Sequence, residues 1–104
     1  MSIRIEDAPA RERYEIYDGE ALAGFTQYRT SAGVIALLHT QMEHEFEGKG
    51  LASQLIRFAL EDAKSRDLHV LPFCPFVNGY IQRHQEWEEL IPLQYRKGFA
   101  SAGS

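Results

Sequence analysis

The stretch VIALLHTQMEHEFEGKGLASQLIRFALEDA, residues 34–63, decides the fold of this chain because its hydrophobic period changes partway along. Residues 34–42 are nearly continuous in apolar side chains, which predicts a strand buried on both faces. After Gly48 and Gly50 the apolar residues recur at helical spacing, which predicts an amphipathic helix that ends near Arg66. Its apolar stripe consists of Leu51, Leu55, Phe58, Ala59 and Ala63.

Two further strands are predicted upstream of this unit. Residues 13–17 alternate between polar and apolar side chains, as a half-buried strand does. Asp18-Gly19 then favours a tight hairpin turn, and residues 22–28 form the return strand. A second turn at residues 30–33 leads into the strand at 34–42. The first dozen residues are charged and contain Pro9, so we expect a loose lead-in there.

Downstream, residues 68–74 are short and extended. Pro72 has no N–H to donate, so this strand must lie at an edge or splay from its neighbour. Residues 75–87 fit either a hairpin turn at Asn78-Gly79 or a helix that begins at Pro75. Their apolar side chains fall on one helical face, which favours the helix. The last residues, 98–104, are expected to be frayed.

The predicted order is therefore β-β-β-α-β-α, an antiparallel meander followed by one right-handed crossover, in the α+β class. A chain of 104 residues with 44% hydrophobic and 25% charged residues is typical of one globular domain. We expect that domain to span residues 1–104, with its core over about residues 12–92.

Several classes of protein are disfavoured by composition. The longest apolar run, residues 34–38, is too short to cross a bilayer, and the N-terminus alternates charged with apolar residues, unlike a signal peptide. A single cysteine cannot form an intramolecular disulfide, and the four histidines lack the spacing of metal ligands. The expectation is a cytoplasmic protein, monomer or homodimer, without a metal or a membrane partner.

Charge is distributed unevenly along the chain. The formal net charge is −4, with nine acidic and five basic residues in residues 1–50 and six of each in residues 51–104. A nucleic-acid-binding domain usually presents a basic face, so a direct nucleic-acid partner is not expected. The acidic half could attract a cationic substrate such as an amine. The plainer alternative is a solvated strand face.

The Gly48-Lys49-Gly50 segment lies where a predicted strand gives way to a predicted helix. Unpaired N–H groups and a partial positive charge at a helix N-terminus favour phosphate, and glycines let the backbone approach a ligand closely. The segment is neither a Walker loop nor a complete GxGxxG motif, which fails at Ser53. On this evidence alone, the glycines could equally serve only to turn the chain.

The run from His39-Thr40-Gln41-Met42 to Glu47-Gly48-Lys49-Gly50-Leu51-Ala52 resembles the acetyl-CoA site of the GNAT acetyltransferase superfamily, whose signature Q/R-x-x-G-x-G/A falls on residues 45–50. The runs LPFCPFV (71–77) and RHQEW (83–87) are similar to the minimal single-domain branch of that superfamily, and the resemblance covers about residues 12–92. Glu45 departs from the signature, and Glu47 stands where many relatives carry Arg. Both weaken the attraction for phosphate and leave Lys49 and the backbone to supply it.

The resemblance implies an N-acetyltransferase that uses acetyl-CoA as donor and acetylates an amine of a small molecule or a protein. The pyrophosphate would lie on the glycine loop, and the pantetheine arm would add to the strand before it. The implied cofactor-binding residues are Thr40, Gln41, Met42, Glu47, Gly48, Lys49, Gly50, Leu51, Ala52, Asn78 and Tyr80. The alternative is a CoA-binding module with little or no activity, because so short a chain lacks the extra elements that build an acceptor pocket.

Cys74 and His39 are the candidate catalytic residues. Cys74 is expected just before a helix, where the dipole favours a thiolate, and a cysteine at the matching position of the resembling branch has been considered catalytic. Its plainer interpretation is a small buried hydrophobe. His39 could act as a base, directly or through water, or be a satisfied core histidine. Glu43 is a weaker candidate base.

Other aromatic residues are assigned structural roles. His84 is expected to cap or pack the last turn of the helix that begins at Pro75. The remaining three, Phe76, Tyr80 and Trp87, are expected to be core aromatics.

Overall fold

The computed structural model describes residues 2–93 and has the predicted α+β class. Its elements are β1 (Ile3–Ala8), the short 3-10 helix η1 (Pro9–Arg11), β2 (Arg13–Asp18), β3 (Ala21–Ser31), β4 (Val34–Met42), η2 (His44–Phe46), α1 (Leu51–Ser65), β5 (His69–Pro72), α2 (Pro75–Arg83) and η3 (Gln85–Leu90). The tail predicted to be frayed, residues 98–104, lies outside the described residues.

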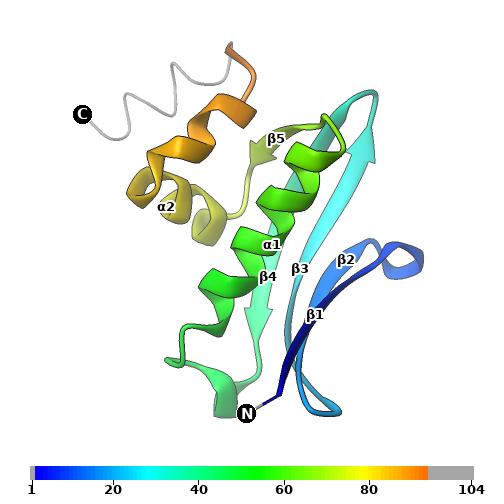
Figure 1. Cartoon of the computed structure of the whole chain (residues 1–104), viewed down its shortest axis with the longest axis vertical. Coiled ribbons are helices and arrows are strands. Elements are labelled where there is room, and N and C mark those ends of the chain that lie inside the picture. The colour runs from blue at the N-terminus through cyan, green and yellow to red at the C-terminus, as the bar shows by residue number, and fades with distance from the viewer. Residues whose placement is uncertain (1, 94–104) are drawn as a thin grey trace.

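The five strands form one sheet in the order β1-β2-β3-β4-β5 (Figure 1). Neighbours are antiparallel except β4 and β5, which are parallel and joined through α1. The predicted hairpin at Asp18-Gly19 is confirmed: Gly19 has φ +62°, and the flanking strands pair from Asp18 and Ala21 onward. The predicted helix bounds are confirmed as well, since α1 ends at Ser65 with Arg66 as its C-cap.

The prediction of a loose lead-in over the first dozen residues was wrong. Ile3–Ala8 is a strand that pairs with β2 along its whole length. Ile3 and Ile5 pack against the core, and Asp7 accepts a 2.6 Å hydrogen bond from the Tyr28 hydroxyl. The charged residues that suggested a loop alternate with these apolar ones, as they do in an edge strand with one wet face.

The expectation that β4 is buried on both faces was also wrong. Ile35 and Leu37 are fully buried, but Leu38 is 38% exposed and His39 is exposed. The inward residues of the sheet form a single core cluster with the buried faces of α1 and α2. Because the helices cover one face of the sheet, alternate residues of β4 remain open to solvent on the other.

The C-terminal part follows the predicted course. β5 is an edge strand, and Pro72 is its last residue. Residues 75–83 are helical, with Pro75 in the first turn. His84 caps α2 through its N–H, which donates to the Tyr80 carbonyl at 2.9 Å. Within residues 2–93 no helix has both the length and the hydropathy needed to cross a membrane.

Candidate functional site

β4 and β5 pair only over a short stretch and then diverge. The last pair is Leu37 with Pro72, and the Cys74 N–H donates to the Leu37 carbonyl at 2.9 Å. Opposite β3, the register steps from Leu37 to His39, so Leu38 is an extra residue that forms a β-bulge. Beyond it β4 continues past the end of β5, toward the start of α1 (Figure 1). In the described part of the chain, residues 39–42 therefore have a strand partner on the β3 side only.

A pocket of about 410 Å³ opens at this end of β4. Its walls come from β4, from the loop between η2 and α1, from the first turn of α1 and from the start of α2. The lining residues are Thr40, Met42, Phe46, Glu47, Gly48, Gly50, Leu51, Ala52, Ser53 and Phe76.

The N-terminus of α1 opens into this pocket without a cap. Gly50 is the N-cap residue, with φ +75°, and Gly48 has φ +78°, a left-handed backbone that favours glycine. No side chain among residues 2–93 caps the first turn, and no acidic residue lies in it. The first N–H groups of α1 are thus left for an external acceptor, and the positive end of the helix dipole adds to their attraction for an anion.

The Glu47 carboxylate in the pocket wall opposes that attraction. Glu47 lines the pocket, and its Oε2 lies 3.4 Å from Nδ1 of His44. The Lys49 ammonium lies 5.6 Å from the centre of the Phe46 ring. Because Gly24 pairs with Met42, the β2–β3 turn with Asp18 lies at the same end of the sheet. Glu47 is therefore the acidic side chain in the wall of a backbone site suited to an anion, and Asp18 lies at the same end of the sheet.

Cys74 lies where β5 gives way to α2 and is the N-cap residue of that helix, as predicted. Its side chain is 3% exposed, and its Sγ lies 3.3 Å from the Thr40 Oγ1. The Thr40 hydroxyl in turn lies 2.9 Å from that of Thr26, which is fully buried. The thiol is therefore connected to the pocket wall through a hydroxyl group.

His39 lies on the other face of β4. Successive residues of a strand point to opposite faces, so His39 and Thr40 are separated by the sheet. The His39 side chain is exposed, and its ring lies 6.3 Å from that of Phe25. The structure thus brings Cys74 to Thr40 and does not bring it to His39. Glu43 is exposed just after β4, where its N–H donates to the Ala23 carbonyl.

Most of the predicted cofactor-binding residues line the pocket, and four do not. Gln41 is exposed, and Lys49 lies over Phe46. Asn78 accepts a hydrogen bond from Gln82, and Tyr80 is buried against the His84 ring, 4.3 Å away. The residues brought together are Thr40, Met42, Glu47, Gly48, Gly50, Leu51 and Ala52.

Three lining residues were missed by the sequence analysis. Phe76, expected in the core, is 44% exposed and forms a wall of the pocket, because Pro75 starts α2 beside the end of β4. Phe46 is an isolated apolar residue in an acidic loop, a signal that could have placed it. Ser53 lies in the first turn of α1, where helix position alone predicts exposure to a ligand. Tyr80 is in the core as expected, and the partly buried Trp87 packs against that core.

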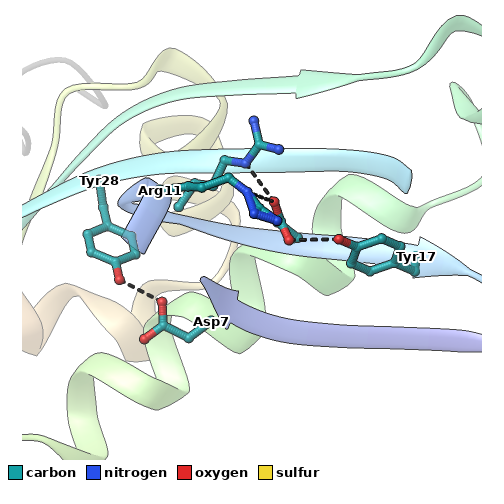
Figure 2. A network of polar contacts seen from close by, with 6 residues as sticks. Asp7, Arg11, Tyr17 and Tyr28 are labelled. Carbon is teal, nitrogen blue, oxygen red and sulfur yellow. Dashed lines mark hydrogen bonds and ion pairs between the residues drawn. The ribbon is translucent and has the colours of Figure 1, made fainter. Parts of the chain in front are cut away.

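A second polar cluster, away from the pocket, was not predicted. Glu15 is 1% exposed and is held by Arg13 at 2.7 Å, by the Tyr17 hydroxyl at 2.7 Å and by Arg11 at 3.4 Å. Figure 2 shows Arg11 and Tyr17 approaching this carboxylate from two sides. Burial alone raises the pKa of Glu15, but the hydrogen bonds from Tyr17 and Arg13 and the charge of Arg11 outweigh it and hold the pKa below its ordinary value.

Side chains that can bind a metal ion are dispersed in the described part of the chain. Within residues 2–93, His, Cys, Asp and Glu side chains do not gather in groups of three that could hold an ion.

Known proteins share features of this sequence and of this fold. The model of the GCN5-related N-acetyl-transferase family matches residues 13–90, from the first residue of β2 to the last of η3. The fold is similar to the solution NMR structure of a GCN5-like protein from Staphylococcus aureus, with a TM-score of 0.67 and 20% identity. That similarity covers 86% of this chain and 87% of the other. At this identity it speaks for the fold alone.

Proposed function

The chain belongs to the GCN5-related N-acetyltransferase family, and from this premise we propose that it binds acetyl-CoA in the pocket at the N-terminus of α1 and transfers the acetyl group to an amine. Family membership supports acetyl transfer as the general activity. The observation that carries the finer proposal is the uncapped N-terminus of α1, which opens into a pocket beside the unpaired edge of β4.

The residues present fit the phosphate groups of CoA. Gly48 and Gly50 bring the backbone into the pocket wall, and a Cβ built on either meets nothing within 4 Å, so the space beside them is open. The N–H groups of Leu51, Ala52 and Ser53 are the donors available there. Glu47 is an unfavourable neighbour for a phosphate, so the backbone supplies most of the attraction.

The edge of β4 fits the remaining part of the molecule. Beyond Leu37 the main-chain groups of β4 on the β5 side have no strand partner, and an extended amide-containing arm can add to such an edge as a further strand does. Thr40 and Met42, on this stretch, line the pocket together with the apolar side chains of Phe46 and Phe76. The pantetheine arm suits such a site, because it carries two amides that can pair with the strand edge on a flexible, largely apolar chain.

Cys74 is the side chain proposed to act at the reacting end. It lies on the β5 side of the divergence, 3.3 Å from the hydroxyl of Thr40. A thiol at a helix N-terminus can donate a proton to a leaving sulfur or accept an acyl group itself. His39 remains a candidate base only for an acceptor that approaches from the open face of the sheet.

A CoA-binding module without activity is the alternative that this short chain keeps open. Titration with CoA and acetyl-CoA, followed by thermal unfolding, tests binding: a ligand at about 100 times its Kd stabilises the fold by about 2.7 kcal/mol, or about 10 °C or more in Tm for a domain of this size. Release of free thiol from acetyl-CoA on addition of amines then separates an enzyme from a binder. No thermal shift with either ligand would contradict the proposal.

A further inference from the structure

We propose that Thr26 and Thr40 form a hydroxyl chain that sets the hydrogen bonding of the Cys74 sulfur, with Thr40 acting as a positioning residue. The three side chains come from β3, from β4 and from the N-cap of α2, and Thr40 is the member that lines the pocket. Their part in acetyl transfer rests on the proposed function, whereas the chain itself rests on geometry.

Burial fixes the direction of the first hydrogen bond. Thr26 is fully buried, and among residues 2–93 its hydroxyl has Thr40 as its hydrogen-bond partner, at 2.9 Å. A hydroxyl carries one proton and two lone pairs, and a buried proton without an acceptor is costly. Thr26 therefore donates to Thr40, which leaves the Thr40 oxygen with one lone pair and its own proton.

The sulfur of Cys74 can form a hydrogen bond with either the remaining lone pair or the proton of the Thr40 hydroxyl. As a thiol, Cys74 donates its S–H to the remaining lone pair of Thr40, and the Thr40 proton points into the pocket. As a thiolate, Cys74 accepts the Thr40 proton instead. Rotation of one hydroxyl thus satisfies both protonation states, and no buried group loses its partner in either.

The backbone of Cys74 keeps the sulfur within reach of that hydroxyl. Its N–H donates to the Leu37 carbonyl at 2.9 Å, and its carbonyl accepts the Asn78 N–H at 3.0 Å. Thr26 and Thr40 are direct partners in the β3–β4 register, so their separation is fixed by the sheet. The chain is therefore built from elements that hold each member in place.

Alkylation of the cysteine by iodoacetamide tests the proposal, because Cys74 is the only thiol in the chain. Thr40→Val removes the hydroxyl at nearly constant volume and should slow alkylation about tenfold at neutral pH, since a hydrogen bond to a charged group is lost. Thr40→Ser should restore the rate. In urea, where the fold is lost, the three proteins should react at the same rate; a folded Thr40→Ser variant that reacts as slowly as Thr40→Val would indicate altered access and would overturn the proposal.

Thr26→Val is the decisive variant because the Thr26 hydroxyl bonds to Thr40 and not to Cys74, and Thr26 does not line the pocket. Loss of its proton weakens the polarisation of Thr40 and should slow alkylation about twofold to threefold, while CoA binding, measured by thermal shift, is retained. A wild-type rate in this variant, with folding verified by circular dichroism, overturns the chain. If Thr26→Val does not fold, the Thr40→Val and Thr40→Ser pair decides alone. Absence of CoA binding in wild type would overturn the proposed function and leave the alkylation result standing.

Discussion

Gly50 shows how one residue can serve both the fold and the site. Its φ of +75° ends the loop and starts α1, and the absence of a side chain leaves the pocket wall open. Gly33, in the β3–β4 turn, has φ +80° and equally open surroundings but lies outside the pocket. Substitution of each glycine in turn therefore distinguishes the effect of backbone strain from the effect of a blocked site.

Gly50→Val should abolish the thermal shift caused by CoA, because a β-branched side chain would occupy the space beside the first N–H groups of α1. Gly33→Val should keep the shift. Both should be destabilised by about 1–3 kcal/mol through strain at positive φ. Thermal unfolding with and without CoA measures both effects, and an undiminished shift in Gly50→Val would locate the CoA site elsewhere.

Cys74→Ser should keep CoA binding and lose about tenfold to a hundredfold in acetyl transfer, the usual range for a positioned acid or base. Cys74→Ala removes the proton donor altogether and should lose at least as much. The assay is thiol release from acetyl-CoA over a range of pH. A trappable acetyl-thioester on Cys74 would instead identify it as the nucleophile. Wild-type turnover in Cys74→Ala would assign the residue to the core.

At the scale of elements, β2 carries the most buried charge in the described chain. Glu15 points to the face of the sheet that no helix covers, yet Arg11, Arg13 and Tyr17 bury it. Arg13 also lies 4.4 Å above the Phe25 ring on β3. Where no helix covers β2, these side chains shield the Glu15 carboxylate from solvent.

Glu15→Gln should lower the free energy of unfolding by about 2 kcal/mol at neutral pH, because hydrogen bonds to a charged group are weakened. The folded-state pKa of Glu15 lies below its ordinary value, so its contribution is present above that value and is lost as pH falls through the folded pKa. The gap between wild type and variant should therefore close in acid, as measured by urea unfolding. Glu6→Gln is the control: Glu6 faces Glu15 in the register, but its side chain is 47% exposed. An equal loss in both variants would contradict the role of burial.

The loop between β4 and α1 sets a different electrostatic balance. Glu47→Gln removes a negative charge from the pocket wall and should tighten CoA binding a few-fold at low salt, with the gain screened as ionic strength rises. Glu61→Gln, on α1 but outside the pocket, should change the affinity little. Calorimetric titration gives both values. Weaker binding in Glu47→Gln would show that the carboxylate contacts the ligand favourably, contrary to this balance.

The elements that the sequence predicts best are those with a strong local signal. Asp18-Gly19, the stripe on α1 and Pro75 each determine structure through their own chemistry, and all three predictions are confirmed. β1 was missed because a short, charged edge strand looks like a loop until its partner is known. The buried Glu15 and the Thr26–Thr40 pair depend on register across strands, which no local pattern contains.

At the scale of the whole molecule, coverage of one sheet face by α1 and α2 leaves the proposed site at one end and the polar cluster at the other side of the sheet. The divergence of β4 from β5 and the start of α1 meet at that end, whereas β1 is the opposite edge strand (Figure 1). CoA binding should therefore change the protection of backbone amides in only a limited part of the fold.

Hydrogen exchange should report this division directly. With CoA bound, the amides of residues 50–53 and of the part of residues 38–42 that faces away from β3 should exchange more slowly, because they gain acceptors and lose contact with water. Amides of β1, paired with β2 on one side and distant in sheet order from the pocket, should exchange at unchanged rates. The comparison also tests the two halves of the site separately. Protection at residues 50–53 alone would support phosphate binding without an arm along β4, and equal slowing in β1 would indicate general stabilisation instead of a local site.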